Sequence, residues 1–433
     1  MPARLGGSAR ARQMGGLSLR IRAQWDYMSF VLTRIWPLVV GMAGVLAAVV
    51  TLAPSQWGLV VSAVALVTGF GMFVRDVVLA RQQWSRLQCV AVVSPFPVAD
   101  VQPPLGYEGA VYLAVQNRGT MLVHPAADRL IREGPIQVEL DATTYRLPAE
   151  LRDIAPLALR TMRAGRVIFD GPMLGLRDDL LPSASGELRP LRLVRTSFFK
   201  QVCSAELCQY RIIDRVTGAE TDVRLQELID PSGRLVTLAA SRLANNMGIS
   251  TLAFTSDDQL LVVHQSAHNV ASARLLAPSG SGTLEPRDMS AAGAGASLQD
   301  VLVVGMEREL CEEAGIGPDD ILQTRVVGFG RWLERGAKPE FFAVTRLKVA
   351  AQDAVIAKIS GEEKLYTERV SAIYVDMNQL RQELDGGLPI EQSPSCPRVI
   401  RDSGSLPLIA GLRAAVLHGW EEHPGVPGQI TQK

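Results

Sequence analysis

Short apolar runs that predict strands and longer segments with helical spacing follow one another over the C-terminal half of the chain. Two of these runs are joined by a short Ser-Asp-Asp turn, which predicts a hairpin, and further strand-like runs follow it. The predicted strands are 250–255, 259–263, 325–329, 340–344 and 372–375. A closing helix is predicted at 406–418 from its periodicity. Strands and helices in this order predict an α/β fold with a mixed sheet between helices.

A helix with a defined start and end is predicted between Ser297 and Gly315. Ser297 and Asp300 have the spacing of a capping box, and Gly315 stands where helices commonly end in a left-handed residue. Three apolar residues inside the segment repeat at helical spacing and predict a core-facing side. These are Val303, Met306 and Leu310.

Three carboxylates lie on another face of this predicted helix. Glu309, Glu312 and Glu313 are one to four positions apart, and residues three or four apart on a helix are neighbours. Such a cluster repels itself unless positive charge lies in it, and Mg²⁺ and Mn²⁺ prefer carboxylate oxygens. The alternative is a solvated, glutamate-rich face. The caps and the packed side of the helix favour a metal site.

The run from Arg308 to Ile316, RELCEEAGI, resembles the second half of the Nudix box, G-x5-E-x7-R-E-U-x-E-E-x-G-U, in which U is aliphatic. Upstream, Gly282 and Asp288 have the five-residue spacing of the first half, and 19 residues then separate Asp288 from Arg308 instead of seven. We infer a 12-residue insertion, largely MSAAGAGAS. Strict counting back from Arg308 would instead place Asp300 at the early acid, with a poor fit at the first glycine.

The resemblance implies a metal-dependent chemistry for this helix. In Nudix enzymes the box helix holds Mg²⁺ or Mn²⁺ ions that bind a diphosphate and activate water for attack at phosphorus. By position, Glu309, Glu312 and Glu313 would be the catalytic metal ligands, and Arg308 would orient them through a salt bridge. The cofactor expected is therefore Mg²⁺ or Mn²⁺.

Two glycines and one further acid complete the candidate site. Gly280 and Gly282 would offer backbone N–H groups and close approach to the diphosphate or metal. Glu340 is a weaker candidate for an additional acid. A surface charge at a strand edge is the more favoured interpretation of Glu340 from the sequence alone.

The N-terminal region contains two long apolar runs. Residues 35–53 and 57–74 carry no charge and are close to the ~20 residues that span a bilayer. They predict a transmembrane α-helical hairpin, with a buried core hairpin as the alternative. Arginines precede the first run and follow the second, so both termini and the Nudix domain are expected on the cytoplasmic side of a two-pass inner-membrane protein. The basic arm would contact anionic headgroups.

The region 88–244 is rich in predicted strands and carries no recognisable motif. It is interpreted either as an extension of the Nudix sheet that shapes substrate access or as a separate, sensor-like module, with a scaffold or dimer contact as the alternative. The predicted organisation is a basic arm, a transmembrane hairpin, this region, a Nudix domain and a tail. Their bounds are 1–34, 35–74, 88–244, 245–422 and 423–433.

Charge and cysteine content narrow the range of partners. Lys and Arg total 44, as do Asp and Glu, which argues against an extended nucleic acid as partner. The five cysteines are an odd number and form no CxxC pair, so a disulfide framework is not expected. His264 and His268 have a metal-like spacing, but a structural role is favoured for both. A nucleotide-sized ligand and a homo-oligomer both remain open.

Three functional hypotheses follow. The first is a membrane-anchored Nudix hydrolase that cleaves a nucleoside diphosphate linked to another moiety, such as a sugar. The second is a nucleotide-sensing effector, because a membrane hairpin joined to a Nudix domain is similar to the membrane effectors of bacterial cyclic-oligonucleotide antiphage systems. The third is a catalytically silent scaffold. The intact set of three glutamates favours hydrolysis.

Overall fold

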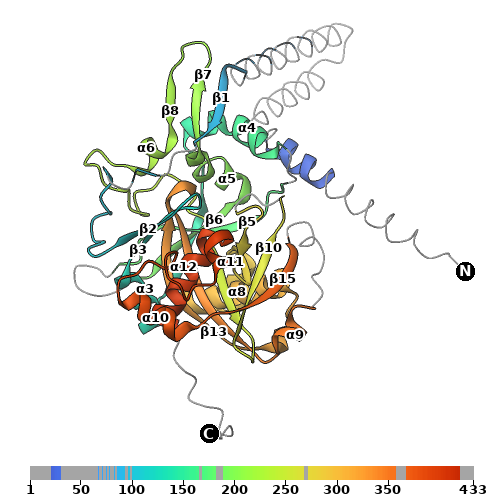
Figure 1. The fold of residues 1–433 in the computed structure, drawn as a ribbon. Coiled ribbons are helices and arrows are strands. Elements are labelled where there is room, and N and C mark those ends of the chain that lie inside the picture. Colours follow the sequence, from blue (N-terminus) through green and yellow to red (C-terminus); the bar gives the residue numbers. More distant parts are fainter. Residues whose placement is uncertain are drawn as a thin grey trace, which may run out of the picture.

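The computed structural model describes residues 21–30, 85–92, 100–164, 168–181, 189–267, 272–356 and 367–419, together with isolated positions between 67 and 97. Within these ranges the chain is a mixed α/β structure in which sheets are flanked by helices (Figure 1). The predicted tail 423–433 and residue His268 lie outside the described residues.

The prediction of a two-pass protein of the inner membrane requires correction. No helix among the described residues combines the length and the apolar character that a bilayer span needs. This finding contradicts the predicted localisation. The runs 35–53 and 57–74 lie outside the described residues except for isolated positions, as does most of the arm 1–34. The prediction rested on the length of the uncharged runs. A transmembrane helix requires such a run, but the run alone does not establish the helix.

A nine-stranded mixed sheet is the central layer (Figure 1). Its order is β11-β10-β9-β14-β13-β3-β2, with β12 also paired to β9 and β15 also paired to β10. The pair β9–β14 is parallel, and the other neighbouring pairs are antiparallel. The strands are β2 (Val111–Val115), β3 (Gly119–Val123), β9 (Gly248–Phe254), β10 (Gln259–Gln265), β11 (Leu276–Ala277), β12 (Gly280–Thr283), β13 (Ile321–Trp332), β14 (Lys338–Leu347) and β15 (Thr367–Tyr374).

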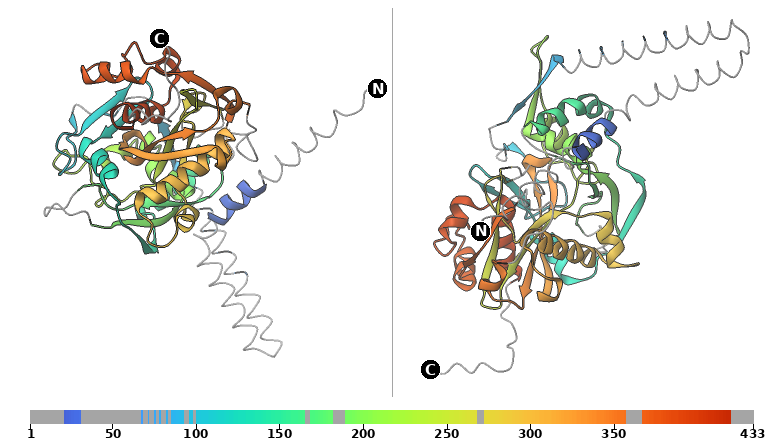
Figure 2. Two further views of the ribbon diagram at one scale, coloured as in Figure 1. Left: turned by 90° about the horizontal axis from the view of Figure 1, so that it is seen from below. Right: turned by 90° about the vertical axis from the view of Figure 1, so that its right-hand side faces the viewer.

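Helices α8 (Leu298–Ala314) and α12 (Leu406–Ala414) cover opposite faces of this sheet (Figure 2). Successive strand residues point to opposite faces, so neighbouring aromatic residues on β14 enter different cores. Phe341 belongs to the same apolar cluster as Met306 of α8, whereas Phe342 belongs to the cluster that contains Leu412 of α12. The expected mixed sheet between helices is confirmed.

Part of the region 88–244 belongs to the central sheet. Strand β3 pairs with β13, with Val123 opposite Gly330, and β2 continues the sheet outward as a hairpin with β3. The rest forms two small sheets. Their strands are β1 (Leu87–Ala91), β7 (Tyr210–Asp214) and β8 (Glu220–Asp222) in one, and β4 (Val138–Thr144), β6 (Leu191–Ser197) and β5 (Pro172–Leu176) in the other. The boundary at 245 stays a prediction.

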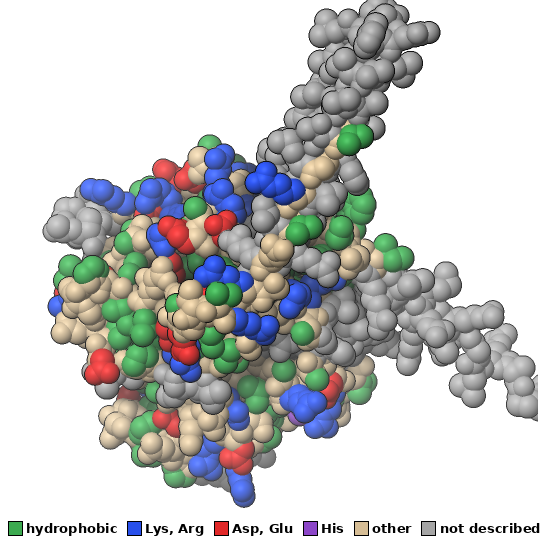
Figure 3. Space-filling view, turned by 90° about the horizontal axis from the view of Figure 1, so that it is seen from above, with side chains coloured by type: hydrophobic (Ala, Val, Ile, Leu, Met, Phe, Trp, Pro, Cys, Tyr) green, Lys and Arg blue, Asp and Glu red, His purple; other side chains and the backbone are tan. Residues whose placement is uncertain are grey.

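The remaining helices lie around these sheets. They are α3 (Pro125–Glu133), α4 (Ala149–Arg163), α5 (Phe198–Val202), η2 (Ala205–Gln209), α6 (Val223–Leu228), α7 (Pro286–Ala292), η3 (Pro318–Asp320), η4 (Leu333–Arg335), α9 (Ala351–Ala354), α10 (Met377–Asp385), α11 (Arg398–Ser403) and the turn η6 (Ala415–Gly419). Basic and acidic side chains both occur across the face seen in Figure 3.

The predicted box helix forms as α8, with the predicted start and end. The Ser297 side chain and Asp300 make a reciprocal capping box at its N-terminus. Gly315 ends the helix in the left-handed region, with φ of 70°. Met306 and Leu310 are fully buried, as their spacing predicts. The helix therefore holds its polar face in a fixed orientation.

The contact between β12 and α8 leaves no room for a side chain at Gly280. A Cβ atom there would lie 2.5 Å from the backbone nitrogen of Leu310. We expect Gly280→Ala to lower the free energy of unfolding by about 1–3 kcal/mol, because strand and helix must separate. Gly134→Ala is the matched control, since a Cβ there meets nothing within 4 Å. Thermal unfolding of both variants would test this, and equal midpoints would contradict the close contact.

Candidate active site

Arg308 lies at the centre of the polar face of α8. Its Nε and Nη2 atoms donate to the two carboxylate oxygens of Asp288 at 2.7 and 2.9 Å. Its Nη1 atom donates to Glu309 at 2.8 Å and to Glu312 at 3.2 Å. Burial alone would lower the pKa of Arg308, but the hydrogen bonds that it donates to Asp288 and the charge of Glu309 raise this pKa. One guanidinium therefore joins three carboxylates, as the predicted orienting role requires.

The 12-residue insertion does not separate the two halves of the acidic site. Helix α7 begins at Pro286, before the insertion, and ends within it, and Asp288 accepts from the backbone N–H of Glu285 in a capping box at 2.8 Å. The chain then returns through α8 and brings Arg308 against Asp288. Asp300, which strict counting would select, instead caps α8 through Ser297. The structure thus pairs Arg308 with the acid that follows Gly282.

Gly282 provides the space that the Glu309 carboxylate occupies. A Cβ atom on Gly282 would lie 2.0 Å from Glu309 Oε1. A Cβ atom on Gly280 would lie 2.5 Å from the backbone nitrogen of Leu310. Both glycines therefore allow β12 to approach the box helix, whereas their predicted contact with a diphosphate is untested.

Glu313 contacts strand β12 through Ser281. Its Oε2 atom accepts from the backbone N–H of Ser281 at 2.7 Å and lies 3.2 Å from the hydroxyl of the same residue. Glu309 and Glu312 instead surround Arg308. Among the described residues, no group of three or more acidic, His or Cys side chains is gathered as a metal ion would need. Arg308 and the Ser281 amide compensate the acidic charge in this arrangement.

The donor set nevertheless fits a hard divalent cation chemically. It consists of carboxylate oxygens on one helix face, which Mg²⁺ and Mn²⁺ prefer. The Glu312 side chain is 36% exposed, and its two oxygens accept only long bonds, 3.2 Å from Arg308 and 3.3 Å from Arg287. Small side-chain rotations are therefore compatible with cation binding.

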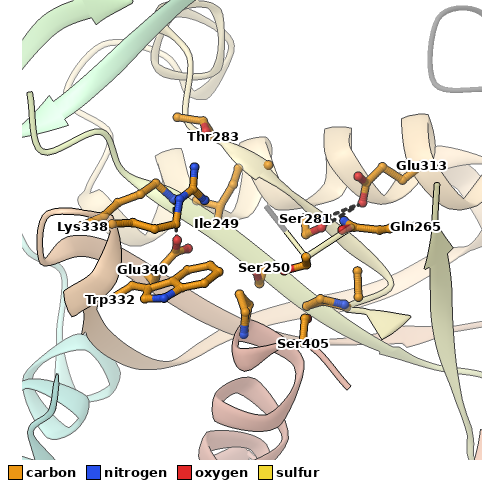
Figure 4. Close-up of a pocket in the computed structure, with 16 residues that line it drawn as sticks. Ile249, Ser250, Gln265, Ser281, Thr283, Glu313, Trp332, Lys338, Glu340 and Ser405 are labelled. Carbon is orange, nitrogen blue, oxygen red and sulfur yellow. Dashed lines mark hydrogen bonds and ion pairs between the residues drawn. The ribbon is translucent and has the colours of Figure 1, made fainter. Parts of the chain in front are cut away.

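A pocket of about 190 Å³ opens beside Glu313, between β9, β12 and β14 (Figure 4). Glu313 lines it from one side, and Glu340 and Lys338 line it from the other. Trp332 and Arg335 close the end of the pocket nearest η4. The box helix and the sheet therefore contribute acidic groups to one pocket.

Lys338 and Glu340 form a buried ion pair in the wall of this pocket. Their side chains are only 5% and 4% exposed. A Cβ atom on Gly248 would lie 1.9 Å from Glu340 Oε2, so β9 makes room for the pair with a glycine. Burial lowers the pKa of Lys338, although the charge of Glu340 opposes this effect. The interpretation of Glu340 as a strand-edge surface charge is therefore wrong.

A second ion pair connects the pocket with the N-terminal region. Arg335 Nε donates to Glu206 Oε1 at 2.8 Å, and the Glu206 side chain in η2 is fully buried. Sequence reasoning missed both residues, because they are far apart in the chain. His264, in contrast, lies in the β10–β15 pair with its Nε2 atom 2.8 Å from the Ser371 hydroxyl, which agrees with a structural role.

Comparisons with known proteins were made for the whole chain. No protein-family model matches the sequence, and no curated protein matches it. Among solved structures, similarity is found to a Deinococcus radiodurans protein with 13% identity, over 43% of this chain and 96% of that one, at a TM-score of 0.24. A MutT protein from Methanosarcina mazei has 16% identity, over 39% of this chain and 92% of that one, at a TM-score of 0.21. A third protein, described as a candidate Nudix hydrolase, has 12% identity, over 36% of this chain and 68% of that one, at a TM-score of 0.20. At these TM-scores, conclusions about this chain rest on its own residues.

The Lys338–Glu340 pair yields a test of the pocket wall. We expect Lys338→Met and Glu340→Gln each to destabilise the protein by about 3–5 kcal/mol, because each leaves one buried charge without its partner. The double variant removes both charges, so its loss should be smaller than the sum of the two single losses. Urea denaturation of the four proteins would measure this, and strictly additive losses would argue against a direct pair.

Proposed function

We propose that this chain is a divalent-metal-dependent hydrolase of the Nudix type, which cleaves a nucleoside diphosphate linked to another moiety. The observation that most supports this proposal is the set of hydrogen bonds that the Arg308 guanidinium donates, to Asp288 on one side and to Glu309 and Glu312 on the other. A solvated glutamate-rich face would require neither the buried acid Asp288 beside Arg308 nor the glycine Gly282 beside Glu309. The unit proposed to carry the activity is 245–422, with 88–244 as its extension.

The residue roles follow from the contacts. Glu309, Glu312 and Glu313 are proposed to hold Mg²⁺ or Mn²⁺. A cation bound there would neutralise charge on a diphosphate and lower the pKa of a bound water. Arg308 and Asp288 are proposed as positioning residues, because Arg308 donates to Glu309 and Glu312 and is itself held by Asp288.

The opposite wall of the pocket suits an anionic substrate. Lys338 places a positive charge there, and Glu340 keeps that charge in position through their ion pair. The Ser281 amide holds Glu313 in the lining of this pocket. The proposed partner is a nucleotide or nucleoside diphosphate derivative, and an extended nucleic acid is not proposed.

Substitution of the three glutamates tests the proposed catalytic role. We expect Glu309→Gln, Glu312→Gln and Glu313→Gln each to lower turnover of nucleoside diphosphate sugars by at least about 100-fold, because each removes a negatively charged ligand. Glu307→Gln is the matched control on the same helix and should keep wild-type turnover. Wild-type turnover in all three variants would exclude this site. Tight nucleotide binding without turnover in the wild type would favour a sensor.

The positioning role of Asp288 can be tested through metal affinity. We expect Asp288→Asn to weaken Mn²⁺ binding by about 10–100-fold, because Arg308 loses its charged anchor and no longer orients the glutamates. Asp300→Asn is the matched control, since Asp300 contacts the helix cap and not Arg308. Calorimetric titration would measure both affinities. A larger loss in Asp300→Asn would instead support the alignment without an insertion.

A further inference from the structure

A second pocket adjoins the acidic one and is much larger. Its volume is about 960 Å³, against about 190 Å³ for the pocket beside Glu313. The two pockets share Ser272, Trp332 and Arg335 in their linings, so they meet at one wall. Pockets that hold small organic ligands generally measure about 300–1,000 Å³. The acidic pocket is too small for a whole nucleotide, whereas the second pocket is large enough.

The N-terminal region builds most of this larger pocket, which we call the extension pocket. The β2–β3 hairpin lines one side from Ala114 to Thr120, and the end of η2 with Tyr210 lines another. The loop that contains Ala273 and the turn at Trp332 close it toward the acidic pocket. Most of the lining therefore comes from the N-terminal region, and Leu406 of α12 also contributes to it.

Charge in the extension pocket suits an anionic ligand. Three arginines line it with a single acid, Glu334. Arg224 and Arg335 are balanced by Asp222 and Glu206. Arg118 donates to the backbone carbonyls of Asp402 and Gly404 and forms no ion pair within the described residues. Its guanidinium charge is thus available to attract phosphate from the adjoining pocket. The arginines that line the pocket are Arg118, Arg224 and Arg335.

We propose that the extension pocket binds the organic moiety of the substrate, a group of nucleoside size, while the diphosphate lies in the acidic pocket beside Glu313. This inference rests on the proposed function for the position of the diphosphate. The N-terminal region is then the specificity element of the site. Trp332 and Arg335, whose guanidinium carbon lies 5.1 Å from the indole ring, form the wall where the two parts of the ligand meet.

Filling the pocket from two sides tests this assignment with the full chain. Ala114→Trp places an indole in the pocket from the exposed hairpin, and Ala273→Trp does so from the opposite loop. Val111→Trp is the matched control, because Val111 lies on the same strand, is 47% exposed and is not part of the lining. The probes are ADP-ribose, UDP-glucose and inorganic pyrophosphate with Mg²⁺. Calorimetry gives Kd, or steady-state kinetics gives KM where a probe turns over.

We expect both filling variants to lose about tenfold or more in affinity for at least one nucleotide sugar, which corresponds to ~1.4 kcal/mol, and to keep wild-type affinity for pyrophosphate. Val111→Trp should behave as wild type. Unchanged nucleotide-sugar affinity in both filling variants would overturn the proposal, as would a wild type that binds neither nucleotide sugar. If nucleotide sugars bind in the extension pocket but are never cleaved, the proposed hydrolase fails while the binding assignment stands.

Discussion

The site depends on one constraint, which is that a cluster of carboxylates on a partly buried helix face requires positive charge. Arg308 supplies this positive charge and donates hydrogen bonds to Asp288, Glu309 and Glu312. Charge interactions are stronger at this partly buried position than in water. The neighbouring structure is arranged around this guanidinium. Helix α7 presents Asp288 through its own capping box, and Gly282 leaves the space that Glu309 fills. The inserted residues between the two halves of the box are accommodated because α7 and α8 pack against each other.

Features encoded by local sequence were predictable. The start and end of α8 follow from Ser297 and Gly315, and its buried face follows from a simple spacing. The paired charges of the pocket were not predictable in the same way. Arg335 and Glu206 are separated by 129 positions and meet only because the N-terminal region folds against the sheet. Lys338 and Glu340 left a weak signal, two charges on one face of an otherwise apolar strand. The prediction of a membrane localisation was wrong, and it rested on hydropathy alone.

The role proposed for the N-terminal region follows from its place in the sheet. Strands β2 and β3 continue the central layer beyond β13, so the hairpin between them is fixed relative to the pocket end of that strand. This attachment lets residues far from the box form a wall of the ligand site. In the proposed function, the box helix would provide carboxylates for a metal ion that binds the diphosphate, and the extension pocket would provide the volume and the contacts that distinguish one organic group from another.

The most direct test of the hydrolase is the identity of its product. The full chain would be incubated with ADP-ribose, UDP-glucose and other nucleotide sugars in ¹⁸O-labelled water, with and without Mg²⁺ or Mn²⁺, and the products analysed by mass spectrometry. The account predicts metal-dependent release of a nucleoside monophosphate and a sugar phosphate, one of which carries a single ¹⁸O from attack of water at phosphorus. Nucleotide sugars that bind and are recovered intact would contradict it.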